Sequence, residues 1–154
     1  MTKKPEHMTH LYGDTLISKC HPRIIFRGKL DSLIARVMLV RCDLLSAGAE
    51  PALLADLQEI QAVLQALMRA EVLDRPLAPD TLFGLSMDQI RAQSHALYPS
   101  APGEGRAYAL LNVLRTAVRE TELAAVAAFG DARPDLAQTL NRLSSAVYIL
   151  MHKA

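Results

Sequence analysis

Proline and glycine divide this sequence into a few long segments, and that division constrains the fold more than any other feature. Pro22, Pro51 and Pro134 each stand where a helix can begin, because proline is tolerated in the first helical turn. Gly48 and Gly130 stand where a helix can end. The positions of these prolines and glycines therefore predict long helices over about 22–46, 51–73, 106–129 and from 134 onward.

Each long segment carries apolar side chains at helical spacing, as a core-facing helix does. The first has Leu30, Leu33, Ile34, Val37, Met38, Leu44 and Leu45, and the last has Leu136, Leu140, Leu143, Val147 and Leu150. Ser86 and Gln89 have the spacing of a capping box, which predicts a further short helix through about residue 94. Four long helices and one short helix indicate an all-α, five-helix bundle.

Composition narrows the class of protein. The chain has 154 residues, 51% hydrophobic and 21% charged, which suits one globular domain with a sizeable core. Its net charge of +1 gives no strong attraction to nucleic acid or to an anionic membrane, so any anion site must be local. Three charged side chains interrupt the most apolar run, 33–45, which argues against a membrane span. Two cysteines, Cys20 and Cys42, without metal-type spacing indicate a reducing, cytoplasmic setting.

The segment 110–123, LLNVLRTAVRETEL, combines a core face with a polar stripe. Its apolar stripe consists of Leu111, Leu114, Val118 and Ala125, and its polar stripe of Asn112, Arg115, Arg119 and Glu122. Two guanidinium groups and a carboxylate beside a core edge form a candidate site for a multiply charged ligand. A solvated face with an Arg119–Glu122 surface pair fits the same spacing, and the stripe by itself favours this second interpretation.

Residues 1–21 are polar, and we expect them to be irregular. A turn at Gly13-Asp14 could hold a phosphate through backbone N–H groups together with Lys19, although an ordinary surface turn fits the same residues.

Histidines at three positions in the same segment, His7, His10 and His21, lie near Cys20. Their spacing matches no standard metal cluster, so we favour solvated side chains and assign no metal ligand.

Five short motifs follow one another in an informative order: GD at 13–14, SKCHPR at 18–23, GKLD at 28–31, RTAVRETE at 115–122 and NRLS at 141–144. In this order they resemble the trimeric, five-helix-bundle cobalamin adenosyltransferases. The stretches THLYGDTLISKCHPR, FRGKLDSLIA, RAEVLDRPL, ALLNVLRTAVRETEL and LNRLSSAVYILM resemble the ethanolamine-utilisation branch of that family. The resemblance covers roughly residues 8 to 151.

The resemblance implies that the chain transfers the 5′-deoxyadenosyl group of ATP to cob(I)alamin, with Mg²⁺ accompanying ATP and triphosphate leaving. It implies one domain, with a nucleotide-binding segment over 1–21 and an adenosyltransferase bundle over 22–154. It also implies a homo-oligomer, a trimer rather than a dimer, in the cytoplasm, and the ethanolamine branch suggests association with a bacterial microcompartment. A non-catalytic corrinoid- or nucleotide-binding carrier or sensor is the alternative, and a structural bundle that binds other proteins is a third.

The resemblance also suggests roles for individual residues. Gly13, Asp14 and Lys19 resemble the family's segment for the ATP phosphates. Arg119 resembles a catalytic triphosphate contact, Glu122 a second catalytic residue that also contacts the nucleotide, and Asn141 a further nucleotide contact. Asp31 and Arg115 resemble a salt bridge between subunits, which would place the site at a subunit interface.

The sequence also departs from the family pattern at several positions. His21 stands where an Asp usually precedes the proline, and Ser145 stands where an Asp often follows NRLS. The second glycine of the nucleotide turn is not evident. The loop over 97–105 is short, and we expect it to be a mobile lid that shapes the corrinoid side.

Overall fold

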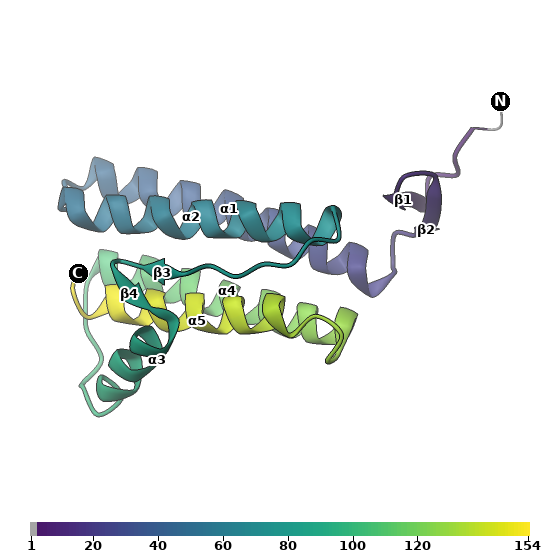
Figure 1. Cartoon of the computed structure of the whole chain (residues 1–154). Helices are drawn as coiled ribbons and strands as arrows, with labels where there is room; N and C mark the ends of the chain where they lie inside the picture. Colours follow the sequence, from purple (N-terminus) through teal and green to yellow (C-terminus); the bar gives the residue numbers. More distant parts are fainter. Residues whose placement is uncertain (1–2) are drawn as a thin grey trace.

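The computed structural model describes residues 3–154, so residues 1 and 2 of the predicted nucleotide-binding segment lie outside the described part. Within this part the chain forms five helices: α1 (Pro22–Ser46), α2 (Pro51–Val72), α3 (Met87–Ala96), α4 (Arg106–Phe129) and α5 (Pro134–Met151). In Figure 1 the α1–α2 pair lies over the α4–α5 pair, and the short α3 packs against α5. The predicted all-α, five-helix fold is confirmed.

The helices begin and end close to the prolines and glycines that predicted their bounds. Pro22, Pro51 and Pro134 each occupy a first helical turn, and Gly130 ends α4 with φ +55°. His21 caps α1, because its Nδ1 accepts a hydrogen bond from the Arg23 backbone N–H at 3.1 Å. The imidazole thus does what the family's usual Asp side chain could do at a helix N-terminus.

The core is formed by the apolar stripes of all five helices, and the predicted stripes of α4 and α5 are buried throughout. The prediction for α1 was too wide, because Met38 and Leu45 are 50% and 64% exposed. The buried positions of α1 alternate in steps of four and three residues, which defines a narrow seam: Phe26, Leu30, Leu33, Val37, Val40 and Leu44. Met38 and Leu45 each follow a seam position by one residue and so point away from it.

Two short hairpins were not predicted. β1 (Met8–Tyr12) pairs antiparallel with β2 (Thr15–Ser18), so the expectation of an irregular N-terminal segment is wrong here. β3 (Thr81–Leu82) pairs with β4 (Leu85–Ser86) just before α3. The N-terminal hairpin lies beyond the end of the bundle, next to the start of α1 (Figure 1).

The loop over 97–105, which we expected to be a lid, is anchored by aromatic side chains. The Tyr148 hydroxyl donates to the Leu97 carbonyl at 3.3 Å, and the Tyr98 ring meets the Tyr148 ring edge-on. Gly103 lies so close to the Tyr108 ring that a Cβ there would come within 2.5 Å of it. The mobility of this loop stays a prediction.

None of the helices in the described residues is long and apolar enough to cross a membrane.

Candidate active site

The polar stripe of α4 is organised by hydrogen bonds that its spacing did not reveal. Arg115 Nε donates to Asn112 Oδ1 at 3.0 Å, one turn earlier on the same helix. Asn112, which had no predicted role, therefore helps to orient the Arg115 guanidinium. Both side chains are partly buried.

Glu122 and Asn141 meet across the contact between α4 and α5. Asn141 Nδ2 donates to Glu122 Oε1 at 3.3 Å, and Arg142 Nη1 donates to Asn141 Oδ1 at 2.8 Å. The structure thus brings together two of the predicted nucleotide contacts from residues 19 positions apart. Within residues 3–154 no ion pair joins Arg119 to Glu122, so the predicted surface pair does not form.

Arg119 is exposed and makes no hydrogen bond or ion pair within the described part of the chain. It borders a shallow groove of about 350 Å³, together with Arg115, Thr116, Glu120 and Leu123. Its guanidinium is therefore available to an anionic ligand, next to the oriented guanidinium of Arg115.

The residues of the N-terminal segment that were predicted to bind phosphate lie apart from the α4–α5 residues. Gly13, at the turn with φ +53°, Asp14 and Lys19 are all exposed. The hairpin meets the bundle at the far end of α4, where Arg23 lies 5.9 Å from the Tyr12 ring centroid and 5.2 Å from that of Phe129. Phe129 follows Arg119 by ten residues, or about 15 Å along the helix axis. One chain therefore does not bring the two predicted sets together.

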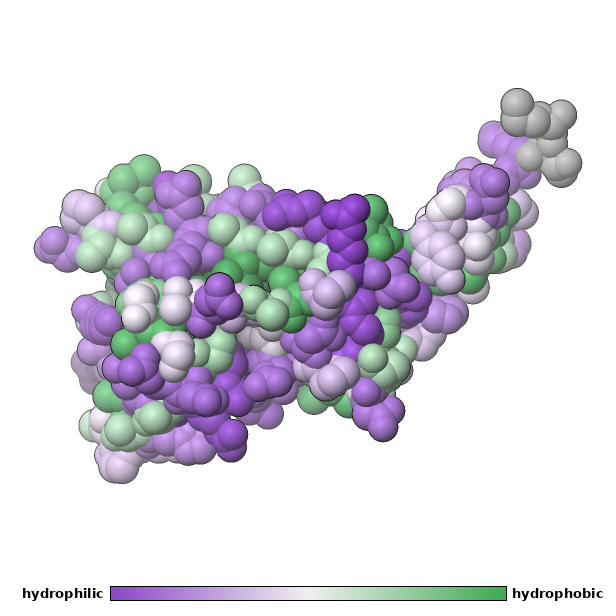
Figure 2. Space-filling model, in the orientation of Figure 1, coloured by the Kyte–Doolittle hydropathy of each residue, from purple (hydrophilic) through white to green (hydrophobic). Residues whose placement is uncertain are grey.

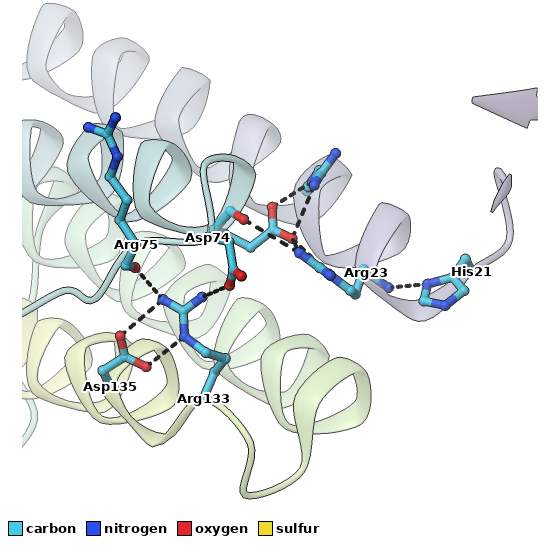
Figure 3. A network of polar contacts seen from close by, with 8 residues as sticks. His21, Arg23, Asp74, Arg75, Arg133 and Asp135 are labelled. Carbon is cyan, nitrogen blue, oxygen red and sulfur yellow. Dashed lines mark hydrogen bonds and ion pairs between the residues drawn. The ribbon is translucent and has the colours of Figure 1, made fainter. Parts of the chain in front are cut away.

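A buried carboxylate behind the hairpin was missed. Glu71 of α2 has no exposed surface, and it accepts hydrogen bonds from Arg23 Nε at 3.0 Å and Arg23 Nη2 at 2.7 Å, and from Arg27 Nε at 2.5 Å. Figure 3 shows Arg23 pointing into this network from the start of α1. A signal was present in the sequence, because Glu71 continues the spacing of Leu57, Ile60, Leu64 and Leu67 on the core stripe of α2. An acid at a core position requires a cationic partner.

A second network ties the segment after α2 to the start of α5 (Figure 3). Arg133 donates to both carboxylate oxygens of Asp135, at 3.1 and 3.0 Å, and to the Arg75 carbonyl at 2.7 Å. Burial opposes ionisation of Asp135, but hydrogen bonds from Arg133 and from the Leu77 N–H outweigh it, and the pKa of Asp135 is lowered. The hydrogen bond to Asp135 raises the pKa of Arg133.

Asp31, predicted to bridge subunits, is exposed on α1 and has no ion-pair partner within residues 3–154. A groove of about 630 Å³ lies between α1 and α4, and its lining includes Ser32, the residue that follows Asp31. Its lining includes Leu39 and Val113, which are 62% and 48% exposed. Figure 2 presents the other side of the bundle, where α2 and α5 lie in front, and shows apolar and polar residues mixed over it.

No group of three His, Cys, Asp or Glu side chains that could hold a metal ion occurs among residues 3–154. His21, one of the histidines considered for such a site, uses its Nδ1 as the helix cap.

Comparison with known proteins identifies the class of protein to which this five-helix bundle belongs. The chain belongs to the cobalamin adenosyltransferase family, whose profile matches residues 1–154. It is similar to the corrinoid adenosyltransferase EutT of Salmonella typhimurium strain LT2, with 41% identity over 165 residues, and to EutT of Escherichia coli K12, with 41% identity over 167 residues. These alignments cover 98% of this chain but 60% of each relative, so the chain spans about three fifths of the length of these curated relatives.

Proposed function

We propose that this chain transfers the 5′-deoxyadenosyl group of ATP to cob(I)alamin, forming adenosylcobalamin and releasing triphosphate, and that it serves ethanolamine utilisation in the cytoplasm in association with a bacterial microcompartment. The observation that carries the proposal is the Asn141–Glu122 contact at 3.3 Å, with the unpaired Arg119 one turn from Glu122 on α4. The similarity to proteins named corrinoid adenosyltransferase supports it.

The proposed reaction needs no nucleophile from the protein. The cobalt of cob(I)alamin supplies the electron pair and forms a bond to the 5′-carbon of ATP, while the bond from that carbon to the triphosphate oxygen breaks. The protein must align the ribose with the cobalt and stabilise the charge of the departing triphosphate. Arg119 is suited to the triphosphate because its guanidinium is exposed and cationic. Glu122 and Asn141 offer an acceptor and a donor for the nucleotide.

The N-terminal segment, residues 1–21, is proposed to contribute Gly13, Asp14 and Lys19 to the phosphates. Because the hairpin of one chain lies away from the middle of α4, we propose that it completes the site of a neighbouring subunit. A Mg²⁺ ion bound to triphosphate needs few protein ligands, and the exposed Asp14 carboxylate is one that the hairpin could supply.

The homo-oligomer, a trimer rather than a dimer, is proposed to form over the face of α1 and α4 that carries the 630 Å³ groove. Asp31 is exposed on α1 and has no ion-pair partner among the described residues, and the Arg115 guanidinium is oriented by Asn112. We propose that Asp31 of one subunit pairs with Arg115 of the next. A groove with exposed apolar side chains on the same two helices suits such a contact.

The test is to mix the purified chain with ATP and chemically reduced cobalamin and to record the absorption spectrum. The proposal predicts the light-sensitive spectrum of adenosylcobalamin, with one triphosphate released for each product. Calorimetry that shows binding of ATP or cobalamin while no product forms would support the alternative, a carrier or sensor. Binding of neither ligand would contradict both.

A further inference from the structure

The side-chain amide of Asn141 lies between two groups that fix its orientation. Arg142 Nη1 approaches Asn141 Oδ1 at 2.8 Å, and a guanidinium can only donate. The amide oxygen must therefore face Arg142, and the amide nitrogen faces Glu122 Oε1 at 3.3 Å. An ionised carboxylate only accepts, so the direction of both hydrogen bonds follows from the outer two residues.

Arg142 itself is buried in an arrangement that does little for stability. It is 8% exposed, and its Nε has no hydrogen-bond partner among the described residues. A buried, unpaired N–H group and a buried guanidinium both cost free energy. Arg142 forms no ion pair among the described residues, whereas Arg23 bonds twice to the buried Glu71.

We propose that Arg142 is a positioning residue, which holds the Asn141 amide so that its nitrogen engages Glu122. The inference rests on the proposed function, because it makes Arg142 act on the nucleotide only through Asn141. With the amide fixed, Glu122 Oε2 and the second N–H of Asn141 remain for the bound nucleotide. Without Arg142 only the 3.3 Å hydrogen bond to Glu122 holds the amide, so the amide is free to rotate away from that position.

The first experiment is a double-mutant cycle on kcat/KM for ATP. Arg142→Met should lower kcat/KM about tenfold, as expected for one lost orienting hydrogen bond, and should leave the unfolding midpoint unchanged or raised. Arg142→Lys keeps a donor and should recover part of the loss. In the Asn141→Ala background, Arg142→Met should cause no further loss. A tenfold loss in both backgrounds would overturn the proposal.

Arg91→Met is the matched control, since Arg91 is exposed on α3 and makes no hydrogen bond or ion pair within residues 3–154. It should leave kcat/KM unchanged.

The second experiment does not depend on activity. The side-chain amide resonances of Asn141 are identified in ¹⁵N NMR spectra by their disappearance in Asn141→Ala. Arg142→Met should shift them, because the amide loses the hydrogen bond that holds its oxygen. Unchanged resonances in Arg142→Met would overturn the proposal. If the wild type forms no adenosylcobalamin, the proposed function fails, while these resonances still decide the role of Arg142.

Discussion

The carboxylate of Glu71, which has no exposed surface, lies 2.7 Å from Nη2 of Arg23 and so joins the last turn of α2 to the first turn of α1. Arg23 also lies over the ring of Tyr12, the residue that directly precedes the turn at Gly13. The N-terminal hairpin is therefore held to the bundle through a buried charge. Because the Arg23–Glu71 pair fixes the hairpin to the bundle, it also fixes the position of the phosphate-binding residues that we propose for the N-terminal segment.

Glu71→Gln should destabilise the fold by about 2–4 kcal/mol, because it leaves the Arg23 and Arg27 guanidinium groups without a buried counter-charge. The free energy of unfolding in urea measures the effect. Glu50→Gln is the control, since Glu50 is exposed at the start of α2 with no capping bond, and should change it by about 0.5 kcal/mol or less. Equal effects of the two changes would contradict the role of Glu71.

Arg23→Lys should loosen the hairpin while the bundle stays folded. Lysine keeps the charge but cannot bond to Glu71 through a planar fork or lie flat over Tyr12. Hydrogen exchange of the backbone amides over residues 8–18 should become faster, while exchange in α4 and α5 should not change. Unchanged exchange in the hairpin would show that Arg23 does not hold it.

Asp135 should make the protein more stable at neutral pH than in acid. Its pKa is lower in the folded chain than in the unfolded chain, so its contribution is complete above the unfolded value of about 3.9 and is lost as pH falls through the folded value. Asp135→Asn should therefore destabilise the protein at pH 7, and its deficit should shrink below about pH 4. Urea unfolding at a series of pH values measures this, and a deficit independent of pH would contradict it.

Asp56 should have the opposite effect on the pH dependence of stability. Burial, aided by Glu59 and opposed by Lys153, raises its pKa in the folded chain. Its ionised form therefore weakens the fold, and stability is lost as pH rises through the folded pKa. Asp56→Asn should remove this cost, so the variant should gain stability over the wild type at pH 7 but not below about pH 4. A loss at pH 7 in the same urea series would contradict the sign.

The helices could be read from the sequence because their signals are local. Pro22, Pro134, Gly130 and the Ser86 capping box each act on the backbone within a few residues, and the structure begins or ends helices at those positions. The β1–β2 hairpin was missed because strands of five and four residues give too few alternations to recognise.

The sequence predicted which polar residues share one face of α4, but it did not predict the hydrogen bonds that they form. Periodicity placed Glu122 on the polar face of α4, but the partner of Glu122 comes from α5, and sequence spacing carries no information on that contact. The Arg142–Asn141 hydrogen bond was missed for a different reason, because adjacent residues of a helix do not normally face each other. Glu71 could have been found, since its position on a core stripe conflicts with its charge.

Asp31→Asn should weaken subunit assembly and activity together if Asp31 pairs with Arg115 across an interface. Sedimentation at a series of concentrations measures the assembly. The charge exchange Asp31→Arg with Arg115→Asp should recover part of the association that either single change loses. An Asp31→Asn variant that is fully active as a monomer would contradict the interface.

Arg119, beside the Glu122–Asn141 contact, is the residue that we propose serves adenosyl transfer from ATP. The most direct measurement is the rate of adenosylcobalamin formation from ATP and cob(I)alamin by the wild type and by Arg119→Ala, with helical content compared by circular dichroism. The wild type should form product, and Arg119→Ala should form it at least about a hundredfold more slowly at unchanged helical content. This corresponds to roughly 3 kcal/mol, as for the loss of a charge that stabilises a transition state. Equal rates for the two proteins, or no product from the wild type, would contradict it.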